Sequence, residues 1–165
     1  MTQLDNNNLC IIEYTTTDGE MLSFLEYAFD AEIVAHTYTE VGQIIFDKPI
    51  SIIGYSAFRE CENLASISIP DSVTDIGDDA FVSCECLREL IIGSSVTNIG
   101  YSAFKDCSSL DSVIIPDSVE NIEDEAFWDC YSLKSIVIGS KVKSIGWDEF
   151  KDCDSLTNIH VDENN

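Results

Sequence analysis

The segment Tyr101–Leu110, YSAFKDCSSL, has a near copy 46 residues earlier in the chain. The copy is Tyr55–Leu64, YSAFRECENL, and midway between the two lies Asp78–Leu87, DDAFVSCECL. All three share the skeleton Ala-Phe-x-x-Cys-x-x-Leu, which recurs every 23 residues. A fixed period of this length is the signature of a repeat protein, in which each unit is one turn of a stack.

Five apolar columns run through the chain at this spacing of 23 residues. They consist of Phe58, Phe81, Phe104, Phe127 and Phe150; Cys61, Cys84, Cys107, Cys130 and Cys153; Leu64, Leu87, Leu110, Leu133 and Leu156; Val73, Val96, Val119 and Val142; and Ile53, Ile76, Ile99, Ile122 and Ile145. One unit alone cannot bury these side chains, whereas stacked units place like on like along an axis. The sequence therefore predicts a solenoid.

Each unit divides into three local patterns. Residues 64–69, LASISI, alternate between apolar and polar and predict a strand that ends at Pro70. Residues 73–76, VTDI, predict a second short extended piece. Residues 77–84, GDDAFVSC, place acids ahead of Ala-Phe and predict a short helix. Successive strands would lie about 4.8 Å apart in a parallel sheet.

The unit L-x-x-I-x-I-(P/G)-x-x-V-x-x-I-(G/E)-x-x-A-F-x-x-C resembles the BspA-type, or treponemal, leucine-rich repeat from Val41 to Val161. The resemblance implies an α/β repeat solenoid: a right-handed coil with a parallel sheet on one face and short helices opposite. Members of the family are commonly surface adhesion or host-interaction proteins, and some bind fibronectin or fibrinogen. The chain departs from the pattern where Glu123 replaces a glycine and Glu149 replaces an alanine.

Three regions are expected along the chain. Residues 1–40 form a β-rich N-terminal cap, with a strand at CIIEY, a turn at Asp18-Gly19 and a strand at EIVAHTY. Residues 41–161 form the solenoid, and residues 162–165 are a tail. The last turn would be thinly covered, so we expect either self-association at this end or a continuation of the native chain.

Composition limits the range of partners. Eight basic side chains against 31 acidic ones give a net charge of -23, which repels phosphate backbones and argues against nucleic acid. No segment approaches the roughly 18 apolar residues of a membrane helix, so no membrane insertion is expected. The N-terminus lacks the basic and apolar regions of a secretory signal, although the family resemblance suggests the cell surface or secretion. Localisation stays open.

The cysteine column is expected to be packing material. Free cysteine is among the most buried residues, and here it lies between phenylalanine and leucine columns. Disulfides between turns and a zinc site are the alternatives, but stacked side chains rarely reach the torsion that a disulfide needs. Cys86 and Cys10 are candidate accessible thiols.

No catalytic or cofactor motif accompanies the repeat, so we expect a non-enzymatic protein without a cofactor. The two histidines, His36 and His160, fall at opposite ends of the stack. Acid pairs such as Asp78-Asp79 and Asp124-Glu125 suit helix starts better than acid–base chemistry. Calcium is the alternative ligand, at an edge where Glu60, Asp106, Asp129 and Asp152 would stack with Ser83 interrupting, although no known calcium-loop spacing is present.

A partner is expected on the outward side of the strands. If Leu64, Ile67 and Ile69 point inward, one outward column runs Ile45, Ser68, Ile91, Ile114, Val137, His160, and its neighbour runs Gln43, Ser66, Glu89, Ser112, Ser135, Asn158. The apolar stripe would be a protein-binding patch rimmed by small polar residues, or a simple reflection of β-propensity. The candidate contact residues are Ile91, Ile114, Val137, Ser68, Glu89, Ser112, Ser135, His160, Trp128 and Trp147.

A second period of 46 residues overlies the first, since Pro70, Gly93, Pro116 and Gly139 alternate at one position. We interpret this as two kinds of unit that arose by duplication. The most consistent function is a protein–protein interaction module, for adhesion or binding of a host matrix protein through the sheet face. The alternatives are a structural spacer within a larger surface protein and a calcium-responsive acidic module.

Overall fold

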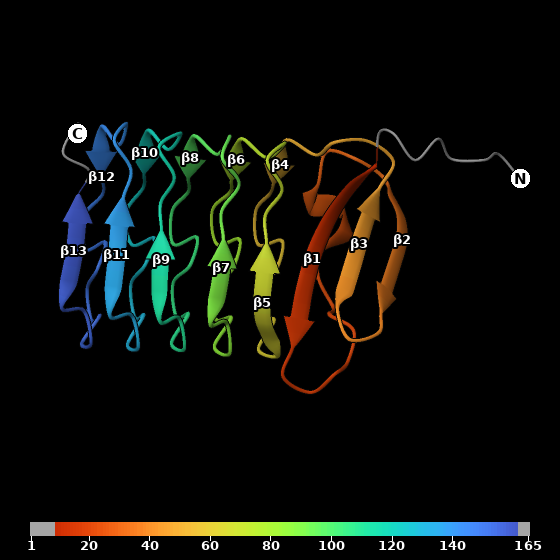
Figure 1. Ribbon diagram of the computed structural model, residues 1–165, viewed down its shortest axis with the longest axis horizontal. Coiled ribbons are helices and arrows are strands. Elements are labelled where there is room, and N and C mark those ends of the chain that lie inside the picture. Colours follow the sequence, from red (N-terminus) through yellow and green to blue (C-terminus); the bar gives the residue numbers. More distant parts are fainter. Residues whose placement is uncertain (1–8, 162–165) are drawn as a thin grey trace, which may run out of the picture.

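In the computed structural model, the 23-residue period becomes a row of stacked turns that continues from an antiparallel N-terminal cap (Figure 1). The structure describes residues 9–161, so the first eight residues of the expected cap and the expected tail at 162–165 lie outside the described residues. Each turn has three sides, two of which are strands. The strands confirm the parallel solenoid predicted from the columns.

The cap consists of β1 (Cys10–Thr16), the 3-10 helix η1 (Glu26–Ala28), β2 (Ile33–Tyr38) and β3 (Gly42–Phe46). Strand β3 lies between β2 and β1 and pairs antiparallel with both. Strand β1 also pairs antiparallel with the first repeat strand, β5, and so joins the cap to the solenoid. The two strands expected in this region are present, but neither pairs with the other.

One side of the solenoid, here called the long-strand face, is formed by the strands predicted at LASISI and its copies. These strands are β5 (Leu64–Ser68), β7 (Glu89–Ile91), β9 (Ser112–Ile114), β11 (Ser135–Ile138) and β13 (Asn158–Val161). Parallel pairing joins β5 to β7, and it joins β11 to both β9 and β13. In the described chain no pairing joins β7 to β9, so this face consists of two sheets.

The second side, the short-strand face, is one continuous parallel sheet. It contains two residues from each turn: β4 (Ile52–Ile53), β6 (Asp75–Ile76), β8 (Asn98–Ile99), β10 (Asn121–Ile122) and β12 (Ser144–Ile145). This sheet confirms the second extended piece expected at VTDI. It runs without interruption past the point where the long-strand face divides.

The third side corrects the expected short helices. Residues 77–84 and their copies form a chain of turns, here called the arc, and η1 in the cap is the only helix in residues 9–161. Two residues per arc have left-handed backbone angles; in the first arc these are Ser56, with φ 54°, and Glu60, with φ 59°. The copies are Asp79, Ser83, Ser102, Asp106, Glu125, Asp129, Asp148 and Asp152.

Hydrogen bonding explains why the arc is not helical. The Phe58 N–H donates to Ala80 O of the next turn at 2.7 Å, whereas the Arg59 N–H donates within its own turn to Ser56 O at 3.1 Å. Amides therefore alternate between the neighbouring turn and the local one. An α-helix is about 10 Å wide and bonds only to itself, so it cannot repeat at the roughly 4.8 Å rise of the strands.

The core is the stack of apolar columns. The rings of Phe58 and Phe81 are nearly parallel, with centroids 5.0 Å apart, and the stacking continues through Phe104 and Phe127. The last step, from Phe127 to Phe150, widens to 6.1 Å. Phe24 of the cap packs on Phe58 at the other end.

The cysteine column lies inside this core, as the packing interpretation predicted. All five thiols are buried and free. The Cys84 thiol donates to Phe58 O at 3.1 Å, and the next three thiols of the column repeat this bond one turn further on. Burial raises the pKa of Cys61 to about 12, so this thiol is protonated at neutral pH.

Candidate protein-binding face

The predicted outward column exists on the long-strand face. Ser68 lies beside Ile91, and Ile114 lies beside Val137. Ile91 and Ile114 are 63% and 67% exposed, while Val137 is half-buried. His160 extends the column as the exposed neighbour of Val137. In the other direction the prediction was wrong, because β1 rather than β3 adjoins β5, and Glu13 instead of Ile45 lies beside Ser68.

The neighbouring column supplies a polar rim. Ser66 pairs with Glu89, and Ser112 pairs with Ser135, which in turn pairs with Asn158. Glu89 and Ser112 are exposed, and Ser135 is half-buried. Exposed isoleucines bordered by small polar side chains therefore lie on one face, as the sequence predicted.

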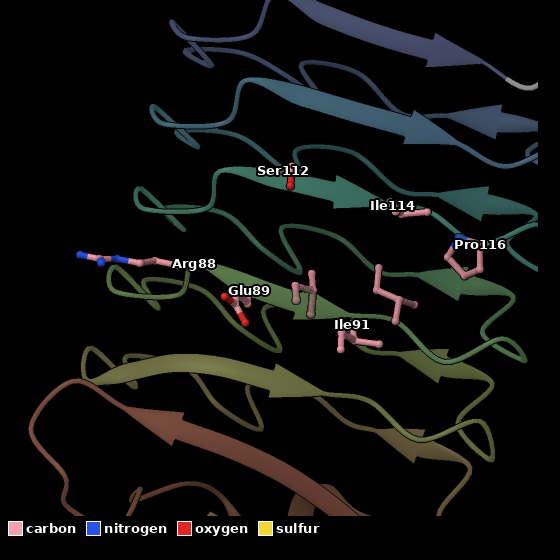
Figure 2. A pocket seen from close by; sticks show the side chains of 8 residues that line it. Arg88, Glu89, Ile91, Ser112, Ile114 and Pro116 are labelled. Carbon is pink, nitrogen blue, oxygen red and sulfur yellow. The ribbon is translucent and has the colours of Figure 1, made fainter. Parts of the chain in front are cut away.

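A cleft interrupts this face between β7 and β9, at the place where the two sheets separate. Its volume is about 410 Å³. Aliphatic side chains form most of its wall and polar groups occupy one end (Figure 2). The lining residues are Arg88, Glu89, Leu90, Ile91, Ile92, Ser112, Ile114 and Pro116. Ile91 lies on one side of the cleft and Ile114 on the other, so the cleft interrupts the exposed apolar column between these two residues.

The two tryptophans lie on the arcs, outside the strands of this face. Trp128 is engaged within the protein, because the Lys105 and Lys151 ammonium groups lie 3.9 Å and 4.2 Å from the centre of its ring. Its Nε1–H donates to Asp152 Oδ2 at 3.2 Å. Trp147 is 84% exposed. The structure therefore separates both tryptophans from the Ile91–Ile114–Val137 column.

Much of the acidity has a structural role along the stack. Asp71 Oδ1 accepts the Ser94 N–H at 2.7 Å, and Asp117 Oδ1 accepts the Ser140 N–H at 2.8 Å. This hydrogen bond from the backbone lowers the pKa of Asp71. Each carboxylate thus satisfies an amide of the following turn, 23 residues on.

The acid pairs assigned to helix starts serve the same stacking. Asp78 and Asp124 accept the backbone N–H groups of Tyr101 and Trp147. Their neighbours Asp79 and Glu125 pair with Arg59 and Lys105 at 3.0 Å and 2.9 Å. The helix-dipole explanation was therefore wrong, and bonds between turns replace it.

The two histidines lie at opposite ends of the molecule: His36 is in β2 in the cap, and His160 is in β13 at the far end (Figure 1). The Tyr14 hydroxyl lies 2.6 Å from His36 Nε2, and burial lowers the pKa of this histidine. At the expected calcium edge, burial and the neighbouring Asp129 raise the pKa of Asp106. Across residues 9–161, no group of three or more His, Cys, Asp or Glu side chains is arranged to hold a metal ion.

Stacked 23-residue turns with a strand-lined face and a phenylalanine stack define a leucine-rich repeat solenoid. The model of the BspA-type leucine-rich repeat region matches residues 31–157 with 6 copies. The chain belongs to this family.

Solved structures of bacterial leucine-rich repeat proteins are similar. A leucine-rich cell surface protein from Faecalibacterium prausnitzii is 38% identical, with a TM-score of 0.66 over 68% of this chain and 30% of its own. The Treponema pallidum leucine-rich repeat protein is 33% identical, with a TM-score of 0.67 over 68% of this chain and 52% of its own. A leucine-rich repeat protein from Bacteroides ovatus is 28% identical, with a TM-score of 0.65 over 96% of this chain and 41% of its own.

This chain therefore spans between 30% and 52% of the lengths of these three relatives. Among curated proteins, none matches it. In residues 9–161 no helix has the length and apolar character needed to cross a membrane.

Proposed function

We propose that this chain is a non-enzymatic protein-interaction module whose long-strand face binds another protein. One observation carries the proposal: Ile91 and Ile114 are each more than 60% exposed, although the repeat buries its other isoleucine columns almost throughout. Exposed apolar side chains with a polar rim mark protein contact sites. In solenoids, the strand-lined face is the extended surface that such contacts use.

The proposed setting is the bacterial cell surface, with a host matrix protein as partner. Membership of the family supports this, as does the 38% identical relative, which is described as a cell surface protein. A surface with a charge of -23 favours a partner that presents basic or neutral groups around its apolar contact.

The test is Ile114→Asp, measured by surface plasmon resonance on immobilised fibronectin and fibrinogen. The added carboxylate lies in the centre of the face and is exposed, so binding should fall at least tenfold while the melting temperature stays nearly unchanged. Tyr55→Asp is the matched control, because Tyr55 is 66% exposed on an arc. Equal binding by wild type and Ile114→Asp to either protein would show that this face is the wrong surface.

The two alternative functions, a structural spacer and a calcium-responsive module, predict different results. A spacer would bind neither matrix protein and would recover no partner through the long-strand face. A calcium-responsive module would gain thermal stability in millimolar calcium, because a ligand that binds only the native state stabilises it.

A further inference from the structure

The division of the long-strand face has a cause in the sequence. At the other steps the turns are joined at this position: the Ile69 N–H donates to Ile91 O at 2.9 Å, and the Ile115 N–H donates to Val137 O at 2.8 Å. The equivalent bond at the step between β7 and β9 would run from the Ile92 N–H to Ile114 O, and the next rung of a parallel ladder would need a donor at position 116 for Ile92 O. Position 116 is proline, which has no N–H.

The alternation of 46 residues makes this step unique among the paired turns. From Pro70 to Gly93, and again from Pro116 to Gly139, a glycine lies against the preceding proline so closely that a Cβ would meet the proline carbonyl oxygen at 2.4 and 2.5 Å. Between Gly93 and Pro116 the order is reversed. The chain contains one such step from a glycine turn to a proline turn, and the sheet divides there.

The opening is confined to one side of the solenoid. On the short-strand face β8 still pairs with β10, and inside the core Phe81 still stacks on Phe104 at 5.1 Å. The turns therefore separate as a wedge whose open end is on the long-strand face (Figure 1). Leu90 and Ile92 are each 9% exposed, whereas the equivalent Val113 and Ile115 are 2% and 1% exposed.

We propose that this cleft is the anchor site for the protein partner and receives one bulky apolar side chain of an extended segment that carries an acidic group beside Arg88. The inference rests on the proposed function and names the partner chemistry at that face. A volume of about 410 Å³ lies within the range of small-ligand pockets and accommodates a leucine- to phenylalanine-sized side chain. Leu90, Ile92 and Pro116 supply the apolar wall.

Two further features favour an extended peptide over a compact apolar ligand. The facing edges of β7 and β9 lack pairing across the cleft, and strand edges recognise extended backbone by supplying main-chain donors and acceptors. In residues 9–161, Arg88 makes no ion pair, and its guanidinium extends away from Glu89 at the polar end of the cleft (Figure 2). In a chain of charge -23, this free cation selects an acid.

The first experiment closes the cleft. Pro116→Gly restores an N–H and removes the Cβ, as at Gly93 and Gly139 of the joined steps, so the Ile92 carbonyl gains a donor and the two sheets join. Hydrogen exchange of the Ile92 and Ile114 amides should slow about tenfold in Pro116→Gly. Pro70→Gly is the matched control, because it lies outside the cleft and leaves these amides unchanged. Unaltered exchange in Pro116→Gly would overturn the proline as the cause and the inference with it.

The second experiment measures binding with a displayed library of random 12-residue peptides selected on the wild-type chain. Enriched peptides should combine a bulky apolar residue with a nearby Asp or Glu and should bind Pro116→Gly at least tenfold more weakly. On Arg88→Ala the preference for the acid should disappear, which gives a readout independent of the folding of the proline variant. Enriched peptides without this pattern, or no enrichment, would overturn the inference.

Val137→Asp separates failure of the cleft from failure of the whole face, because Val137 lies on the face but outside the cleft. If peptide binding is lost on Val137→Asp but unaffected by Pro116→Gly, the long-strand face remains the binding face and the cleft is not the anchor. Peptides unaffected by both variants would remove both.

Discussion

At the residue scale, Glu149 is a carboxylate side chain that is buried unfavourably in the repeat. It occupies the column that holds Ala57, Ala80, Ala103 and Ala126 in the other turns, and it is 4% exposed. Neither of its carboxylate oxygens has a hydrogen-bond partner at good geometry, and the nearest donor is the Ala126 N–H. Burial raises the pKa of Glu149 to about 8, and the neighbouring Ala126 amide offsets only part of this effect.

Glu149→Ala should therefore stabilise the protein by about 1–3 kcal/mol at neutral pH, since it removes a buried polar group without a partner. The gain depends on pH. Between the unfolded pKa near 4.3 and the folded value of about 8, the native state binds the extra proton, so the stability of the wild type falls as pH rises through this window. The difference in melting temperature between variant and wild type should be small at pH 4.5 and largest at pH 8.

The control for this prediction is the exposed Glu62→Ala, which should show no such pH-dependent difference. A constant difference between Glu149→Ala and wild type from pH 4.5 to 8 would mean that Glu149 is ionised and hydrated in the native protein.

The thiols provide a second prediction at this scale. Cys86 is half-exposed, whereas the column cysteines and Cys10 are buried, and burial raises the pKa of Cys84 well above its usual value. Because alkylation needs an accessible thiolate, native protein treated with iodoacetamide at pH 8 should gain one adduct, at Cys86. Intact-mass spectrometry checks this result, and denatured protein should gain seven adducts. Rapid native labelling of Cys107 would contradict the packed column.

At the element scale, the strands were predictable and the third side was not. Alternation in LASISI locates β5 correctly, and the 23-residue spacing places every later strand in register. Acids before Ala-Phe in GDDAFVSC are equally typical of a helix start and of residues that tolerate left-handed angles, as Asp79 does with φ 55°. The spacing between neighbouring turns decides between a helix and left-handed turns, and the local sequence does not encode this spacing.

The proposed binding face was likewise predictable only in part from the sequence pattern. Its columns from Ser68 to His160 follow from the repeat, but the insertion of β1 beside β5 depends on a long-range pairing that no repeat encodes. The cleft was missed, although its signal, Pro116 opposite Gly93, is present in the alternation of 46 residues.

The arc also allows a prediction. Asp106 has φ 59°, and burial together with the nearby Asp129 raises its pKa. Asp106→Gly should keep or slightly raise stability, because glycine adopts this angle freely and the repulsion is removed. Asp106→Val should cost about 1–3 kcal/mol, since a β-branched residue is strained there. Urea unfolding of the pair checks this. If valine were tolerated as well as glycine, the arc would not require the left-handed angle.

At the scale of the whole molecule, the first and the last turn of the stack differ in how well their apolar side chains are covered. Phe24, Leu22 and the cap strands cover the first turn, whereas at the last turn Ile159 is 55% exposed and Val161 is 48% exposed. In the described chain, β13 pairs with β11 alone. Unpaired strand edges with apolar side chains recruit further strands, so this end is the expected site of self-association between copies.

Electrostatics sets the condition under which that association should appear. Two copies of charge -23 repel each other at low salt, and screening lengths fall from about 10 Å at 0.1 M to about 3 Å at 1 M ionic strength. Sedimentation equilibrium should therefore show a dimer fraction that grows with sodium chloride. Ile159→Lys should abolish it although the lysine reduces the net repulsion, because a charge on an edge strand blocks pairing. Tyr55→Lys, with the same charge change on an arc, should dimerise as the wild type does; equal dimerisation by Ile159→Lys would place the contact elsewhere.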